Sequence, residues 1–261
     1  VSRVRIPLSP PQLRIKMDIE KIFSKIGFNI KPNDDYRKAY SYRFKKGIYK
    51  LINLDRKFTF NNCVIDKDVE NIKLKNALLK IDSMSTYAIG HLVNQICKSL
   101  SENQIYLNIG CWKGFTLISG MVDTTCKVIG VDNFSQFDGP KNEFYFNFQK
   151  YQNKDKHFFY DEENKIFFEN FEKKNERISF YYYDGEHSYK NQFDNLHIAD
   201  NFLDKGSIIL IDDINFPEVE NGTNDFLSKT RSNYKVLKKI KTANNHCHPS
   251  FWNGIMILEK Q

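Results

Sequence analysis

The sequence lacks any uninterrupted apolar run that approaches the roughly 20 residues needed to cross a bilayer. It also lacks the series of charged, apolar and small residues that marks a signal peptide. We therefore expect a soluble protein without a membrane partner. No Cys-x-x-Cys pair is present and the number of cysteines is odd, which argues against a disulfide framework or a zinc knuckle. A reducing cytoplasm is the simplest setting for these cysteines, which are Cys63, Cys97, Cys111, Cys126 and Cys247.

Clustered basic residues are also absent, although the formal net charge is +7. Proteins that bind nucleic acids gather Lys and Arg to neutralise phosphates, whereas the lysines of this chain are scattered. The chain is also rich in Asn, Ile, Phe and Tyr, which AT-rich codons specify together with Lys. Genome composition therefore explains the charge, and a nucleic-acid partner is not expected.

The chain does contain enough apolar material for a sizeable core. A length of 261 residues, 41% of them hydrophobic, suits one large domain or one domain with an appendage. Residues 1–16 are rich in Arg and Pro, unlike the rest, and predict an extended arm. We also hypothesise that this arm is upstream sequence and that Met17 is the true start. Residues 17–82 show the short, mixed patterns of an N-terminal appendage, and residues 83–261 form the main domain.

Strand and helix patterns alternate through the main domain. Strand patterns such as QIYLNIG, CKVIGVD, ISFYYYDG and GSIILIDDI are separated by helical patterns such as NKIFFENFEKKNE. This alternation predicts an α/β fold with a mostly parallel sheet covered by helices on both faces. The end differs, because YKVLKKIKT and FWNGIMILEK are strand patterns with a loop and no helix between them. That pairing must be antiparallel.

Residues that can carry chemistry follow several strand patterns at the point where each strand ends. The stretch FYYYDGEHSYK runs from a strand into a turn that holds Asp184 and His187. In YLNIGCWKGFTL, Gly110 and Gly114 let the backbone pass close to a ligand at a helix start. Asp132 ends the next strand pattern, where nucleotide-binding α/β folds place an acid for the ribose hydroxyls. The glycine loop is neither a Gly-x-Gly-x-x-Gly dinucleotide fingerprint nor a phosphate loop.

Together and in this order, these segments resemble the class I S-adenosylmethionine-dependent methyltransferases over about residues 85–261. The nearest likeness is to the small-molecule O-methyltransferases that include catechol O-methyltransferase and the macrolide-sugar enzymes. The resemblance implies a Rossmann-like, seven-stranded, mostly parallel sheet with an antiparallel terminal strand and helices on both faces. It also implies S-adenosylmethionine as cofactor, bound by a loop that contains Gly110, Cys111, Trp112 and Gly114.

The resemblance implies roles for three further positions. Asp132 is expected at the ribose, and Asp161 or Glu162, after the third strand, is expected beside the adenine. Asn108 stands among the cofactor-binding positions where the family usually carries an acid. Its amide can hydrogen-bond but has no charge for the cofactor's amino group, so the affinity is expected to be lower or the contact to come from elsewhere.

Three acids predict a metal site. Asp184, Asp212 and Asp213 end successive strands of the predicted sheet, and carboxylates meeting there repel unless a cation or protons neutralise them. Oxygen ligands suit Mg²⁺, Ca²⁺ or Mn²⁺. In the metal-dependent enzymes that the chain resembles, acids at these places hold Mg²⁺, which binds the oxygens of the methyl acceptor. The alternative interpretation is that Asp212 and Asp213 are turn or cap residues.

His187 lies three residues after Asp184, the offset at which catechol O-methyltransferase carries a lysine base. Histidine titrates near neutrality and could accept the acceptor's proton, although a lone histidine is more often structural. His197 falls in a helical pattern and is expected to pack or to lie at the surface. The segment NNHCHPSFW lacks the further ligands of a zinc site and indicates at most a loop on the substrate side.

Three functional hypotheses follow. The leading one is an S-adenosylmethionine-dependent O-methyltransferase, acting on a small-molecule or sugar hydroxyl and assisted by a divalent metal. The second is a nucleic-acid methyltransferase, which should show a basic face and an acceptor-specific motif, neither of which the sequence displays. The third is a binding protein on the same fold that has lost catalysis, motivated by Asn108. The sequence names neither the acceptor nor the oligomeric state, and a homo-oligomer stays open.

Overall fold

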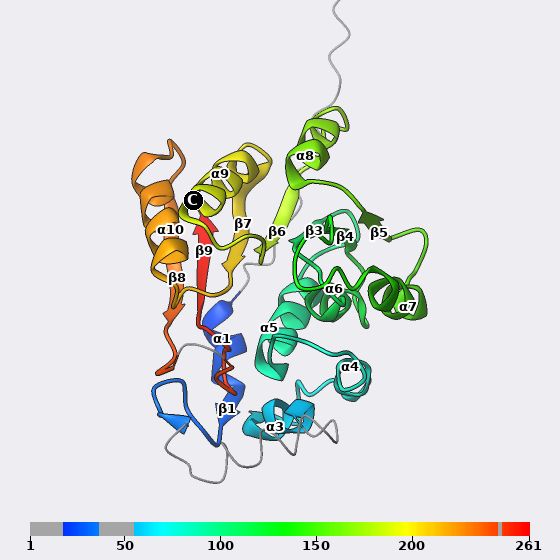
Figure 1. Ribbon diagram of the computed structural model, residues 1–261, viewed down its shortest axis with the longest axis vertical. Helices are drawn as coiled ribbons and strands as arrows, with labels where there is room; N and C mark the ends of the chain where they lie inside the picture. The colour runs from blue at the N-terminus through cyan, green and yellow to red at the C-terminus, as the bar shows by residue number, and fades with distance from the viewer. Residues whose placement is uncertain (1–17, 37–54, 245–246) are drawn as a thin grey trace, which may run out of the picture.

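The computed structural model describes residues 18–36, 55–244 and 247–261, so the predicted arm and Met17 lie outside the described residues. A seven-stranded sheet with the strand order β5-β4-β3-β6-β7-β9-β8 forms the centre of the molecule (Figure 1). Its strands are β3 (Ile105–Ile109), β4 (Lys127–Val131), β5 (His157–Tyr160), β6 (Ile178–Tyr183), β7 (Leu203–Ile211), β8 (Tyr234–Ile240) and β9 (Ile255–Lys260).

Strands β3 to β7 pair in parallel, and β9 runs antiparallel to both of its neighbours, β7 and β8. The predicted fold class is therefore confirmed, including the antiparallel terminal strand. This strand lies one position inside the sheet edge, which β8 forms. All five residues of β3 are buried, as expected for a parallel strand covered on both faces.

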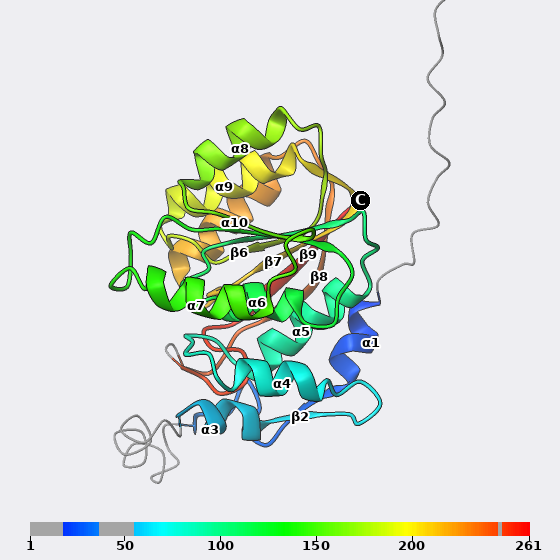
Figure 2. The same ribbon diagram turned by 90° about the vertical axis from the view of Figure 1, so that its right-hand side faces the viewer.

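Helices cover both faces of the sheet (Figure 2). One layer contains α5 (Tyr87–Lys98), α6 (Phe115–Met121) and α7 (Lys141–Tyr151), and the other contains α8 (Asn164–Glu172), α9 (Tyr189–Asp200) and α10 (Pro217–Lys229). Each layer buries its own apolar cluster against the sheet. The side chains of α5 show why the helix forms there: Thr86 caps its first turn by accepting from the Ile89 amide, and the apolar stripe of the helix is buried. Among the described residues, no helix has the length and apolar character needed to cross a membrane.

The N-terminal appendage packs below α5 (Figure 2). Its described elements are α1 (Ile19–Ser24), β1 (Ile26–Phe28), α3 (Asp55–Asn62), β2 (Cys63–Ile65) and α4 (Ile72–Leu78), with β1 and β2 paired antiparallel. Ile19, Phe60 and Leu74 belong to the same buried cluster as the inward face of α5. The appendage therefore shares one core with the main domain.

The connection between β8 and β9 packs onto the appendage. The Phe251 ring lies 5.8 Å from the Phe23 ring and 5.1 Å from the Phe28 ring, measured between centroids. His248 is fully buried, with Nδ1 2.7 Å from the Ser250 hydroxyl and Nε2 3.0 Å from the Asp34 carbonyl oxygen. This histidine is structural, and it anchors the connection.

Candidate active site

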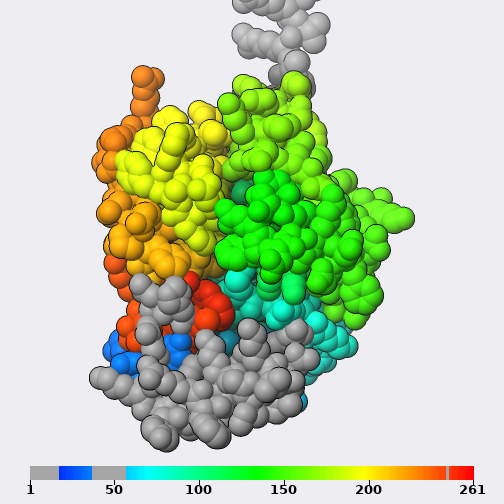
Figure 3. Space-filling view, in the orientation of Figure 1, coloured from blue at the N-terminus to red at the C-terminus, as the bar shows by residue number. Residues whose placement is uncertain are grey.

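A cavity of about 600 Å³ opens at the carboxyl ends of β3, β4, β6 and β7. The chain leaves β3 toward β4 on one side and returns to β6 on the other, so the cavity lies where the strand order reverses. Open α/β sheets bind their ligands at this position. The segment before α7 and helix α9 both line the cavity, and their green and yellow surfaces adjoin in Figure 3.

The glycine loop after β3 forms one wall of the cavity. Gly110 has a φ of +80° and Gly114 a φ of +93°, both in the left-handed region that favours glycine. A Cβ on Gly110 would also overlap the carbonyl oxygen of Asp184 at the end of β6. Cys111 and Trp112 line the cavity between the two glycines. The predicted cofactor loop is therefore at the cavity, and glycine is required at Gly110 because two strand ends meet there.

Asp132, at the end of β4, holds this loop in place. One carboxylate oxygen accepts from the amides of Cys111 at 2.7 Å and Trp112 at 2.8 Å. The other oxygen accepts from the Phe134 amide at 2.7 Å. An ionised carboxylate offers about four acceptor positions, so capacity for a further hydrogen bond remains. Sequence reasoning placed Asp132 at a ligand but did not foresee that it also shapes the loop.

Asn108 lies behind the glycine loop and does not line the cavity. It is fully buried, its side-chain oxygen accepts from the Thr116 hydroxyl at 2.8 Å, and its amide donates to the Gly110 carbonyl at 3.0 Å. Asn108 therefore supports the loop from behind, and its contact with the cofactor stays a prediction. The buried position explains why an amide is suited here. The amide bonds to one side chain and one backbone carbonyl without the free-energy cost of a buried charge.

Asp161 and Glu162, the two acids expected beside the adenine, differ in whether they line the cavity. Asp161 pairs with Lys141 at the start of α7 and is not among the residues that line the cavity. Glu162 lines the cavity, as does Glu163, which accepts a hydrogen bond of 2.6 Å from Asn133. The structure therefore favours Glu162 over Asp161, because the side chain of Asp161 turns toward the helix.

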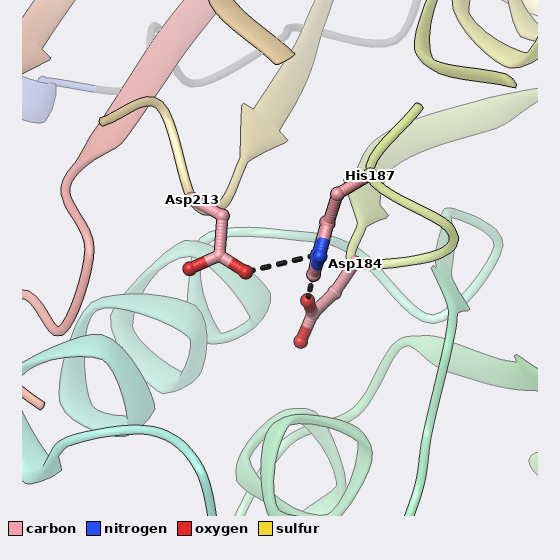
Figure 4. A group of neighbouring side chains, drawn as sticks. All are labelled: Asp184, His187 and Asp213. Carbon is pink, nitrogen blue, oxygen red and sulfur yellow. Dashed lines mark ion pairs between the residues drawn. The ribbon is translucent and has the colours of Figure 1, made fainter. Parts of the chain in front are cut away.

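Asp184, His187 and Asp213 meet at the cavity where β6 and β7 end (Figure 4). The His187 Nε2 lies 2.9 Å from Asp213 Oδ2 and 3.6 Å from Asp184 Oδ1. One ligand atom from each residue falls within 4.8 Å of the others. Within the described parts of the chain, this is the one group of His, Cys, Asp and Glu side chains compact enough to hold a metal ion.

Asp212 is not part of this cluster. One of its oxygens accepts from the Tyr182 hydroxyl and the other from the Asp213 amide at 2.9 Å. Burial raises the pKa of Asp212 well above the usual range, and the nearby Asp184 and Asp213 carboxyls raise it further. The predicted ligand set is corrected here, since His187 stands where Asp212 was expected. Asp213, with a left-handed φ of +58°, lines the cavity, whereas the Asp212 side chain is bonded inside the protein.

The cluster carries strongly perturbed groups. Burial raises the pKa of Asp184, and the neighbouring His187 partly offsets this effect. For His187, burial lowers the pKa, but the carboxyls of Asp184 and Asp213 outweigh burial and raise it to about 10. At neutral pH and without a cation, His187 is therefore an imidazolium between two carboxyl groups.

Two residues at the site were missed by sequence reasoning. Asn253, from the β8–β9 connection, donates a hydrogen bond of 2.7 Å to Asp213 Oδ1. Ser85, just before α5, lines the cavity with a buried hydroxyl that has no hydrogen-bond partner. Neither position follows from a local pattern, because each reaches the cavity through tertiary packing. His246 of the segment NNHCHPSFW lies outside the described residues, whereas Cys247 lines the cavity.

Comparisons with known proteins agree with this architecture. Residues 107–214 match the family model described as "Methyltransferase domain". None of the curated proteins matches the chain at a significant level. The solved structure of an O-methyltransferase from Bacillus cereus in complex with S-adenosylhomocysteine is 13% identical, with a TM-score of 0.54, over 74% of this chain and 92% of that one.

Two more solved structures are similar in fold. TomG from Streptomyces achromogenes, an O-methyltransferase of tomaymycin synthesis in complex with S-adenosylmethionine, is 8% identical, with a TM-score of 0.52, over 74% of this chain and 91% of that one. A candidate caffeoyl-CoA O-methyltransferase from Staphylococcus aureus is 10% identical, with a TM-score of 0.51, over 85% of this chain and 100% of that one.

The matched segment runs from β3 to the residue after Asp213 and so includes the glycine loop, Asp132 and the three-residue cluster. At these low identities the solved structures show the fold, while the family match shows the kind of domain. The chain therefore contains a methyltransferase domain, and this domain has the fold of the class I S-adenosylmethionine-dependent methyltransferases.

Proposed function

We propose that the protein transfers a methyl group from S-adenosylmethionine to a hydroxyl of a small molecule or sugar, with the assistance of a divalent cation. The observation that carries the proposal is that the glycine loop and the cluster of Asp184, His187 and Asp213 line one cavity. A cofactor on the loop and an acceptor at the cluster would then meet within that cavity. The two O-methyltransferases that were solved with S-adenosylhomocysteine or S-adenosylmethionine support this choice of cofactor.

The cofactor would occupy the end of the cavity formed by β3 and β4. The free acceptor position on Asp132 would take a ribose hydroxyl, and Glu162 lines the part of the cavity where the adenine would lie. The unpartnered hydroxyl of Ser85 is available to a polar group of the cofactor. Trp112, whose indole donates to the Phe137 carbonyl at 3.3 Å, fixes the loop that follows β4 beside this end.

The acceptor would lie at the cluster. Asp184 and Asp213 supply carboxylate oxygens and His187 a ring nitrogen, which are donors that divalent cations accept. A cation bound there would hold the acceptor's oxygen and lower the pKa of its hydroxyl. Once the hydroxyl proton has passed to water, methyl transfer would form a bond between this oxygen and the methyl carbon and break the carbon–sulfur bond, so the sulfonium would leave as an uncharged thioether. The protein's part is to align the two groups in the cavity.

The role of His187 as general base stays a prediction, and the two carboxyls beside it oppose that role as long as no cation neutralises them. With a pKa raised to about 10 by the two carboxyls, His187 already carries a proton at neutral pH. A protonated imidazole cannot accept the acceptor's proton. His187 is free to act as a base only if the carboxyls that flank it are moved or neutralised.

The cavity favours a small acceptor over a nucleic acid. Among the described residues that line it, none is Lys or Arg, while six are Asp or Glu: Asp132, Glu162, Glu163, Asp184, Glu186 and Asp213. Phosphate backbones require positive charge at the binding surface. The buried, bonded Asn108 also weakens the case for a fold that has lost catalysis, since its amide supports the loop.

The direct test is transfer of a radiolabelled methyl group from S-adenosylmethionine to hydroxyl compounds. Matched panels of catechols, hydroxylated aromatics and sugars are incubated with the protein in the presence of Mn²⁺ or Mg²⁺, and in excess EDTA. We expect labelled O-methyl product with the metals and loss of product in EDTA, with the far-UV circular dichroism unchanged. Full turnover in EDTA rejects the metal, and label that appears only on nitrogen or on nucleic acid rejects the acceptor class.

A further inference from the structure

We propose that His187 is a ligand of the cation, and that the site therefore takes a transition-metal ion such as Mn²⁺, Co²⁺ or Zn²⁺ in preference to Mg²⁺. This inference rests on the proposed function, because it concerns the cation of the same site. It departs from the all-oxygen ligand set expected from the sequence, in which Asp212 stood in place of His187. It also gives His187 a role other than that of a base.

The distances within the cluster are those of ligands around one ion. Two ligand atoms that each lie about 2.1 Å from a metal are about 3.0 Å apart at a right angle and about 3.4 Å apart at a tetrahedral angle. The separations from His187 Nε2 are 2.9 Å to Asp213 Oδ2 and 3.6 Å to Asp184 Oδ1. His187 Nε2 thus lies at about the spacing of a co-ligand from each carboxylate oxygen, and all three donor atoms fall within 4.8 Å of one another.

The orientation of the imidazole points the same way. His187 Nε2 is buried, and the carboxylate oxygens of Asp184 and Asp213 are its near polar neighbours. The imidazole also packs beside the Phe216 ring, with centroids 5.7 Å apart. A buried ring nitrogen that lies between two carboxylates is suited to a shared cation.

Asp213 contributes a single oxygen to this arrangement. Asn253 donates to Asp213 Oδ1 at 2.7 Å, which leaves Oδ2 facing His187. The cluster therefore offers one ligand atom from each of three residues, all at the cavity. Fewer protein ligands than a metal's full set leave positions for acceptor oxygens or water.

The donor set selects among metals. Mg²⁺ takes oxygen ligands in near-ideal octahedral geometry, whereas imidazole suits metals such as Fe²⁺, Ni²⁺, Cu²⁺ and Zn²⁺. Affinity for a nitrogen-containing site rises along the series from Mn²⁺ through Co²⁺ and exceeds that for Mg²⁺. One imidazole with two carboxylates therefore favours the transition metals.

The test is metal binding by the untagged full chain, measured by calorimetry with Mg²⁺, Mn²⁺ and Co²⁺ in the presence of S-adenosylhomocysteine. We expect Mn²⁺ and Co²⁺ to bind at least about 10-fold more tightly than Mg²⁺. His187→Asn should weaken Mn²⁺ binding about 10- to 100-fold and change Mg²⁺ binding less. His197→Asn, on the exposed face of α9, is the matched control and should leave both affinities unchanged.

Electron spin-echo spectroscopy of bound Mn²⁺ provides a second readout, which does not depend on the measured affinity. Modulation from an imidazole ¹⁴N, present in the wild type and absent in His187→Asn, supports the proposal. Bound Mn²⁺ without nitrogen coupling, or Mg²⁺ bound as tightly as Mn²⁺, overturns it while leaving a metal-assisted enzyme intact. Failure of every metal to bind, with S-adenosylhomocysteine still bound, overturns both this inference and the metal part of the proposed function.

Discussion

Asn253 and Asp213 lie 40 residues apart in the sequence, yet the Asn253 amide donates a 2.7 Å hydrogen bond to the Asp213 carboxylate. Asp213 has a φ of +58°, which costs a non-glycine residue about 1 to 3 kcal/mol. Asp212 offsets part of this cost by accepting from the Asp213 amide. Two segments, the β8–β9 connection and the end of β7, therefore both help to fix Asp213 in the conformation that faces the cavity.

Asn253→Ala should weaken Mn²⁺ binding about 10- to 100-fold, because the carboxylate loses the partner that fixes its orientation. The control is Asn215→Ala, since Asn215 donates 2.9 Å and 3.0 Å hydrogen bonds to Thr242 in the same connection. Calorimetry of both variants separates the two roles. Equal Mn²⁺ affinity in wild type and Asn253→Ala would show that Asp213 is positioned without Asn253.

Gly110→Ala should destabilise the protein and weaken cofactor binding. The φ of +80° alone costs about 1 to 3 kcal/mol with a side chain, and the new Cβ overlaps the Asp184 carbonyl oxygen. Gly27→Ala in β1 is the control, because its Cβ would meet only ordinary contacts of 3.6 Å and 3.7 Å. Urea unfolding of both variants is the measurement. A Gly110→Ala protein as stable as wild type would mean that the ends of β3 and β6 can move apart without a loss of free energy.

Asp132→Asn should lower the affinity for S-adenosylmethionine by about 1 to 3 kcal/mol, the range for a charge-assisted hydrogen bond. The amide would lose the charge that holds the Cys111 and Trp112 amides as well as an acceptor for the ribose. Asp161→Asn is the control, since Asp161 pairs with Lys141 outside the cavity lining. If Asp132→Asn binds the cofactor as tightly as Asp161→Asn, Asp132 has no part in the cofactor site.

The buried His91 should make the folded protein less stable in mild acid. It is fully buried in α5 with neither ring nitrogen hydrogen-bonded, and burial lowers its pKa to about 4, with Lys98 adding to the effect. The unfolded chain takes up the proton near pH 6.5, so this contribution to the free energy of unfolding is present above pH 6.5 and falls as the pH drops toward 4. The loss should reach about 2 kcal/mol at pH 5.

The pH dependence of His91→Phe provides the check. Urea unfolding at pH 5 and pH 7.5 should show a smaller drop for His91→Phe than for wild type, because phenylalanine binds no proton. His197→Gln, at an exposed position, should keep the wild-type difference. Parallel curves for wild type and His91→Phe would mean that His91 does not stay neutral in the folded protein.

The fold was predictable because its signals are local and repeated. Alternating strand and helix patterns fix a parallel sheet, and two strand patterns without a helix between them fix the antiparallel pair β8 and β9. Strand ends share one edge, so Asp132, Asp184 and Asp213 could be placed at the cavity from sequence.

The finer details of the site depend on side-chain direction and tertiary packing. Asp213 faces the cavity and Asp212 does not, and no hydrophobic pattern encodes which of two adjacent acids does so. Asp161 turns to Lys141, a partner on a neighbouring helix. Asn253 reaches the site from a loop held by contacts with the appendage, and such contacts cannot be derived from periodicity.

The central claim is that cofactor and cation share the cavity at the ends of β3, β4, β6 and β7. A crystal structure of the protein with S-adenosylhomocysteine and Mn²⁺, with anomalous data at the manganese edge, tests it most directly. We expect the adenosyl group between the glycine loop and Asp132, and one manganese peak bonded to Asp184, His187 and Asp213. Cofactor density outside this cavity, or a manganese peak held by other residues, would contradict it.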